Sequence, residues 1–181
     1  MDTLVENINY YEEIKNKLIE NEIYVKVKDF SKERNKVITY YEIGKLLSEA
    51  GGKYGDNIID EYSKKLVVDV GKKYNRRTLF RMKQVYCLFK DKNVSPAVTH
   101  LTWSHYLILL SVKNYDAICY YIRQVQIRNL SKRQLEDIIK NNEYERLPED
   151  TKNKLTVSEE LGITDCVKNR IIIKNNNNYE I

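Results

Sequence analysis

The chain has 181 residues, of which 42% are hydrophobic, and a formal net charge of +5. This length suggests one domain with additional segments and permits about two-thirds of the unfolded surface to be buried. The apolar content argues against wholesale disorder, and the absence of any run of about 18 apolar residues argues against a membrane span.

The first residues begin a series of amphipathic helices. Apolar side chains recur there at three- and four-residue steps, the spacing of one helix face: Leu4, Ile8, Tyr11, Ile14 and Leu18. A second helix follows Ser31, a candidate cap, and has Gly44 on its apolar stripe. A glycine there lets a neighbouring helix approach closely. We expect Gly51 and Gly52 to end this second helix.

The third and fourth helices are separated by a short turn. The third begins at Asp56, and Gly71 is placed to close it with a left-handed residue. Asn75 is a good N-cap for the fourth helix. The apolar stripe of that fourth helix is Leu79, Met82, Val85, Tyr86 and Phe89.

The remaining helices lie between the two prolines, Pro96 and Pro148. Thr102 caps a helix that starts at Trp103, and another helix covers residues 115–127. Ser131 and Gln134 form a capping box before the last helix. No strand-like alternation occurs before residue 147, so we predict an all-α, multi-helix domain over residues 1–150. Residues 151–181 end in an asparagine run and are expected to form a poorly ordered tail or a shortened linker.

Cysteine and histidine give no sign of a metal site or of a disulfide framework. The three cysteines are odd in number and widely spaced, and we expect Cys87 and Cys119 to be core residues in a reducing cytoplasm. The acidic first residues, MDTLVENINYYEE, are atypical of a secretory signal. His100 and His105 are five residues apart, which does not suit a helical metal pair. His105 is expected to be a partly buried, hydrogen-bonding residue.

Positive charge is concentrated in one window. Between Gly71 and Lys92 there are eight basic residues and one acidic residue, a net of +7, so the rest of the chain is slightly acidic. Such a concentration is typical of an anion-binding surface. A compositional bias toward lysine is an alternative source of this charge, but it does not account for the arginines Arg76, Arg77 and Arg81.

The basic window coincides with the turn and the start of the fourth helix. Two helices joined in this way, near residues 56–90, form a candidate helix-turn-helix, whose second helix places its N-terminal residues in the major groove. Its C-terminal half anchors in the core, which accounts for charge at the start and apolar mass at the end. The predicted nucleic-acid contacts are Lys72, Lys73, Tyr74, Asn75, Arg76, Arg77, Thr78, Arg81 and Lys83.

The helical wheel and the other side chains leave alternatives open. Arg77, Arg81 and Gln84 fall opposite the apolar stripe, whereas Phe80 and Leu88 interrupt the polar face and are either covered or exposed to a partner. A solvated amphipathic helix without a ligand is one alternative to DNA binding, and RNA or an acidic protein surface is another. The 15 tyrosines are expected mainly in the core rather than as a stacking platform.

Several motifs together resemble the N-terminal domain of the YhcG family, bacterial proteins of unknown function. They are Ile-Gly-Lys at 43–45 after a tyrosine, Tyr-Gly at 54–55, the arginine-rich start of the fourth helix, Trp-Ser-His-Tyr at 103–106 and Tyr-Glu-Arg at 144–146. The resemblance covers roughly residues 35–150. It implies a helix-turn-helix domain, with or without a wing, that precedes a nuclease-like domain of the PD-(D/E)xK type in full-length members. The implied role is DNA binding in restriction or mobile-element defence.

Two positions of the family pattern differ in this chain. The N-cap serine of the family corresponds to Asn75, which still caps, and the asparagine three residues later corresponds to Thr78. If the side chain at that position reads a base, the resemblance implies a different DNA specificity here.

The residues needed for nuclease chemistry are not evident. That chemistry requires acidic residues and a lysine on a β-hairpin to hold Mg²⁺, whereas the only Glu-x-Lys, Glu13 to Lys15, lies on a helix. We therefore expect no catalysis and no cofactor, and either a shortened member or a stand-alone binding module. The expected partner is double-stranded DNA. The alternative function is a protein-interaction scaffold, in which the first two helices, around Gly44, form a homodimer or bind a nuclease or modification subunit.

Overall fold

The computed structural model describes residues 9–26, 32–55, 57–90 and 101–159, and all regular elements in these ranges are helices. The all-α prediction is confirmed, and the described ranges contain no β-hairpin that would form a wing. The chain forms two compact units, Met1–Asp91 and Lys92–Ile181. None of the described helices has the length and apolar character needed to cross a membrane. Ser31, Asp56, His100 and Cys166 lie outside the described residues.

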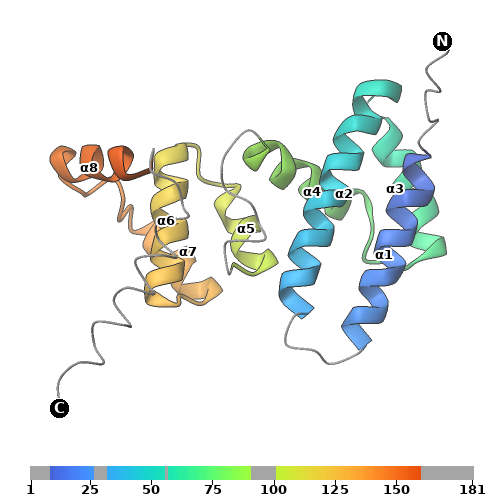
Figure 1. Cartoon of the computed structure of the whole chain (residues 1–181), viewed down its shortest axis with the longest axis horizontal. Coiled ribbons are helices and arrows are strands. Elements are labelled where there is room, and N and C mark those ends of the chain that lie inside the picture. The colour runs from blue at the N-terminus through green and yellow to red at the C-terminus, as the bar shows by residue number, and fades with distance from the viewer. Residues whose placement is uncertain (1–8, 27–31, 56, 91–100, 160–181) are drawn as a thin grey trace, which may run out of the picture. The chain divides into compact units, whose positions relative to one another are not determined.

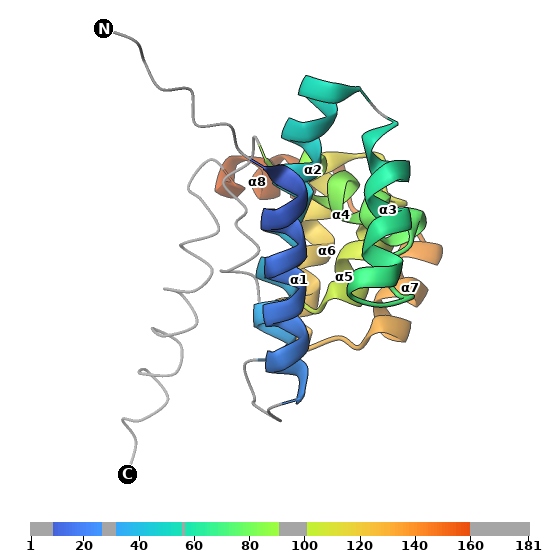
Figure 2. The ribbon, with the colours of Figure 1, turned by 90° about the vertical axis from the view of Figure 1, so that its right-hand side faces the viewer.

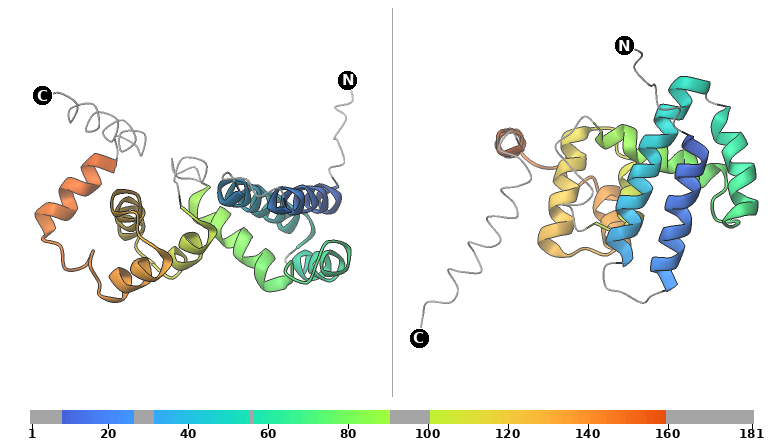
Figure 3. Two further views of the ribbon diagram at one scale, coloured as in Figure 1. Left: turned by 90° about the horizontal axis from the view of Figure 1, so that it is seen from below. Right: turned by 45° about the vertical axis from the view of Figure 1, so that its right-hand side comes forward.

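The first unit contains four helices: α1 (Tyr10–Lys26), α2 (Lys32–Tyr54), α3 (Ile58–Asp69) and α4 (Arg76–Phe89). α1 and α2 run alongside each other, and α4 crosses α2 (Figures 1 and 3). Figure 2 shows α3 beside α1 within this unit. α4 also packs against α3, so the basic helix is held by two neighbours. Several apolar side chains at the centre are fully buried: Ile14, Leu18, Ile43, Leu47, Leu66, Leu79, Met82, Val85 and Phe89.

The end of α2 differs from the prediction. We expected Gly51 and Gly52 to terminate this helix, but it continues to Tyr54. A glycine inside a helix costs only about 1 kcal/mol, which packing along the rest of α2 offsets. Gly55 ends the helix instead: its φ is 85°, and its N–H donates to the Gly51 carbonyl at 2.9 Å. This positive φ favours glycine, since side chains with a Cβ rarely adopt it.

The predicted close approach at Gly44 is confirmed, and the neighbour is α4. A Cβ added to Gly44 would lie 2.3 Å from the Met82 carbonyl oxygen and 2.8 Å from the Tyr86 Cβ. The backbones of α2 and α4 therefore touch at a point where only a hydrogen atom fits. This contact fixes the depth at which α4 sits in the unit.

The second unit contains α5 (Trp103–Leu109), α6 (Tyr115–Arg128), α7 (Lys132–Lys140) and α8 (Glu149–Glu159). α7 packs against both α5 and α6. The largest fully buried side chains of the second unit are Tyr106, Leu109 and Tyr121. α8 occupies the start of the segment for which the sequence predicted a tail, and residues 160–181 lie outside the described ranges.

The predicted caps of the second unit are present. The Gln134 side chain accepts from the Ser131 N–H at 2.8 Å, and the Ser131 hydroxyl accepts from the Gln134 N–H at 3.5 Å. Nδ1 of His105 accepts from the Thr102 N–H at 3.2 Å at the start of α5. Burial lowers the pKa of His105, which keeps the imidazole neutral and able to accept this bond. His105 is thus a hydrogen-bonding residue, as expected, and it is buried more deeply than predicted.

Gly44→Ala tests the contact between α2 and α4. The added methyl group must push the two backbones apart, so we expect a net loss of at least about 1 kcal/mol in the free energy of unfolding, although alanine is the better helix former. Gly52→Ala is the matched control, because Gly52 is exposed in the same helix and has nothing within 4 Å of an added Cβ. We expect Gly52→Ala to raise stability by about 0.5–1 kcal/mol. Urea unfolding of both variants provides the comparison, and equal midpoints would contradict the close approach.

Candidate nucleic-acid interface

The turn between α3 and α4 is built from local hydrogen bonds. The N–H groups of Val70 and Gly71 both donate to the Leu66 carbonyl at 3.0 Å, which closes α3. Gly71 has φ of 157°, so it has a positive φ but lies outside the left-handed helical region that we expected. Asn75 is the N-cap of α4, as predicted, and its side chain accepts from the Thr78 N–H at 3.1 Å. The start of α4 is therefore fixed by a capping side chain that satisfies one free amide.

Tyr74 does not lie where the sequence analysis placed it. We expected it to contact the DNA backbone, but it is fully buried. Its hydroxyl donates to Oε1 of Glu22 on α1, and its ring meets that of Tyr40 edge-on, with 6.5 Å between the centroids. Burial, together with the hydrogen bond to Glu22, raises the pKa of Tyr74, so that it stays a neutral donor. Tyr74 is thus an anchor for the turn and is not available to a ligand.

Two of the predicted cations form ion pairs inside the first unit. Lys73 Nζ pairs with Glu22 on α1, and Arg76 Nε pairs with Asp60 on α3. The side chains of both cations remain more than half exposed, so these pairs are screened by solvent and weaken with salt. Lys83 is half-buried and also interacts with another residue. The carboxylates of Glu22 and Asp60 offset part of the positive charge in the basic window.

Three other predicted cations have no such partner within the described ranges. Lys72, Arg77 and Arg81 make no hydrogen bond or ion pair with any residue that the structure describes. Lys72 and Arg77 are exposed, and Arg81 is half-buried. Arg77 and Arg81 are four residues apart and so lie on one side of α4. Thr78 is half-buried, and its hydroxyl lies 3.4 Å from Oδ1 of Asn75, so that it supports the cap.

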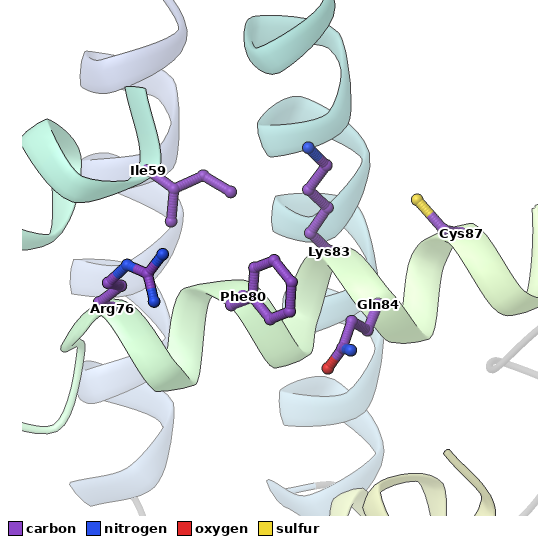
Figure 4. A pocket seen from close by; sticks show the side chains of 6 residues that line it. All are labelled: Ile59, Arg76, Phe80, Lys83, Gln84 and Cys87. Carbon is purple, nitrogen blue, oxygen red and sulfur yellow. The ribbon is translucent and has the colours of Figure 1, made fainter. Parts of the chain in front are cut away.

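An open groove of about 470 Å³ runs along the outer face of α4. Ile59 of α3 lines it at one end, and the other side chains come from α4 (Figure 4): Arg76, Phe80, Lys83, Gln84 and Cys87. Phe80 is 44% exposed, whereas Ile59 is only 4% exposed. The groove thus combines an apolar centre with polar and cationic surroundings.

The sites predicted from the sequence cover this outer face only in part. Phe80 was expected as an interruption of the polar face, and neither Phe80 nor Gln84 was among the predicted contacts. The available signal was the position of an aromatic residue opposite the buried stripe. The expectation that Cys87 is a core residue is wrong, since Cys87 is exposed on this face, whereas Cys119 is buried as expected. A cysteine side chain does not require a polar partner, so its residue type does not indicate whether it faces the core or the solvent.

Asp69, an acidic residue of α3, has structural partners within the first unit. Asp69 accepts from the Tyr11 hydroxyl at 2.6 Å and pairs with Lys15 at 3.0 Å, and both contacts lower its pKa. Among the described residues, no three side chains of the metal-binding types lie close enough to hold an ion. What this region offers chemically is a cationic surface with a capped helix end, suited to anions.

Comparison with known proteins gives one finding. The family model described as the DUF1016 N-terminal domain, the N-terminal region of the YhcG family, matches residues 13–146. This range includes both α3 and α4 and most of the second unit. No curated protein and no solved structure matches the chain.

Tyr74→Phe tests the anchor of the turn. Removing a buried hydroxyl that bonds to a carboxylate should lower the free energy of unfolding by about 1–2 kcal/mol. Tyr54→Phe is the control, since Tyr54 is 51% exposed. Chemical denaturation near neutral pH measures both, and equal effects would contradict the anchoring role.

Tyr74→Phe should also change the way in which the stability of the protein depends on pH. Because the pKa of Tyr74 is raised in the folded state, the unfolded chain releases this proton first as pH passes about 10. Stability contributed by the bond is therefore present below pH 10 and is lost above it. We expect the decline in stability above pH 10 to be shallower in Tyr74→Phe than in the wild type.

Proposed function

The chain belongs to the DUF1016 N-terminal domain family, and we propose that it binds double-stranded DNA through α3, the turn and α4, without being catalytic itself. The observation that carries this proposal is the position of Arg77 and Arg81. Both lie away from the buried stripe of α4, and neither has an ion-pair or hydrogen-bond partner among the described residues. Arginine suits bidentate contact with phosphate or with guanine.

The contacts that hold α4 in place support its role as a recognition helix. Its buried side packs on α2 at Gly44 and its first turn is capped by Asn75, so the outward side chains project from a fixed element. Rigid placement matters because base and phosphate contacts require defined geometry. The buried Tyr74 holds the preceding turn, while Lys72 beside it stays exposed and available for the phosphate backbone.

Charge balance also supports binding to a polyanion. Between Gly71 and Lys90 the chain has seven basic residues and no acidic one. Glu22 and Asp60 pair with two of these cations, which leaves an excess of positive charge in the window. A surface of this kind attracts DNA with a strong dependence on salt.

The alternative of a scaffold loses its original support. That interpretation rested on the apolar stripe around Gly44 as a surface for another chain. Gly44 is buried against Met82 of the same chain, so this stripe is used within the first unit. The setting in restriction or defence, with cleavage supplied by a nuclease domain or subunit, rests on the resemblance to the YhcG family and is part of our proposal.

The double variant Arg77→Ala/Arg81→Ala tests the proposed helix. We expect at least about a tenfold loss of affinity for a labelled duplex, and a salt dependence shallower by about two phosphate contacts. Arg133→Ala/Arg146→Ala is the matched control: it removes the same charge from two exposed arginines of the second unit. Thermal melts verify that all variants are folded. Equal affinity of the α4 variant and the wild type would exclude this helix as the binding element.

Asp60→Asn tests whether one more unpaired cation strengthens DNA binding. Its carboxylate pairs with Arg76, and removing this negative charge frees the guanidinium for a phosphate. We expect tighter binding at low salt and a salt slope steeper by about one contact. Asp137→Asn on α7 makes the same change of net charge at an exposed site in the second unit. A gain of equal size in both variants would mean that only net charge matters, and not the position of Asp60.

A further inference from the structure

The outer face of α4 presents four side chains at the spacing of a base-reading helix. Arg77, Phe80, Arg81 and Gln84 occupy positions i, i+3, i+4 and i+7, which fall within about 100° of arc. Recognition helices in the major groove use this spacing to reach successive base edges. Figure 4 shows Phe80 and Gln84 on α4 in the same groove as Arg76.

Phe80 has no evident role in the core. The buried side of α4 is already filled by other residues, whereas Phe80 remains 44% exposed within the most basic part of the chain. An exposed aromatic ring has apolar surface that a partner would remove from water. The neighbouring Ile59, which is almost fully buried, extends the apolar lining of the groove.

Gln84 supplies the complementary polar group. It is exposed, and its amide has no hydrogen-bond partner among the described residues. A glutamine amide pairs bidentately with N6 and N7 of adenine, and an apolar side chain contacts the C5 methyl group of thymine. The two residues are separated by about one helical turn of 5.4 Å, which spans one to two steps of 3.4 Å in DNA.

We propose that the outer face of α4 reads A·T base pairs in the major groove, with Phe80 against a thymine methyl group and Gln84 on an adenine. This inference rests on the proposed function and adds its substrate class. The phosphate charge complements Arg77 and Arg81, which share the outer face of α4 with the two reading side chains. A charged peptide could use the same cations but would present no methyl group and no adenine edge in register.

The test compares three alternating duplexes of equal length: dA·dT, dA·dU and dG·dC. Uracil lacks only the methyl group, so wild-type protein should bind the dA·dU duplex about fourfold more weakly than the dA·dT duplex. Phe80→Ala should bind these two duplexes equally. Ile127→Ala is the control, because Ile127 is an apolar residue that is 66% exposed on α6, outside the proposed binding helices; it should keep the wild-type ratio.

Gln84→Ala tests the adenine contact separately. The wild type should prefer dA·dT over dG·dC, and this preference should fall by at least about fivefold in Gln84→Ala. Circular dichroism shows whether each variant retains its helices, which is expected because both side chains lie on the surface.

The outcomes separate the two proposals. If the wild type binds none of the three duplexes at low salt, or binds polyglutamate as tightly as DNA, the proposed function fails. If it binds DNA but does not distinguish thymine from uracil, or prefers dG·dC, only the present inference fails. A ratio between thymine and uracil that is unchanged in Phe80→Ala would also overturn the assignment of the methyl contact to Phe80.

Discussion

The contact between Gly44 of α2 and the backbone of α4 at Met82 sets the geometry of the first unit. At 2.3 Å from an added Cβ, the Met82 carbonyl leaves room for no side chain, so the two helices meet backbone to backbone. Close packing of this kind is stiff, because any separation of the helices would open a void in the core. The buried face of α4 is thereby determined, and so is the direction in which Arg77 and Arg81 project.

The turn before α4 depends on a second, longer-range constraint. Tyr74 reaches across to Glu22 of α1, and the same carboxylate also pairs with Lys73. One acidic residue thus holds a buried hydroxyl and neutralises an exposed ammonium group. Asp60 on α3 likewise neutralises the guanidinium group of Arg76. The positive surface is consequently narrower than a simple count of lysines and arginines indicates, and it is centred on Lys72, Arg77 and Arg81.

Local features of this fold are readable from the sequence, whereas the partners in long-range contacts are not. Helix positions follow from periodicity, the cap at Asn75 from its chemistry, and the close approach at Gly44 from a glycine on an apolar stripe. The burial of Tyr74 could not be predicted, because its partner Glu22 lies 52 residues away. The continuation of α2 past Gly51 and Gly52 depends on tertiary packing that outweighs helix propensity. The division after Asp91 likewise depends on contacts between helices that no local pattern specifies.

The two faces of α4 share no side chains. Leu79, Met82, Val85 and Phe89 belong to the interior, whereas Arg77, Phe80 and Gln84 face outward. Evolution can therefore alter the outward set without disturbing the interior, since exchanges at such surface positions change folding energy little. A scaffold divided in this way is evolvable: relatives could diverge in what they recognise while inheriting the same skeleton.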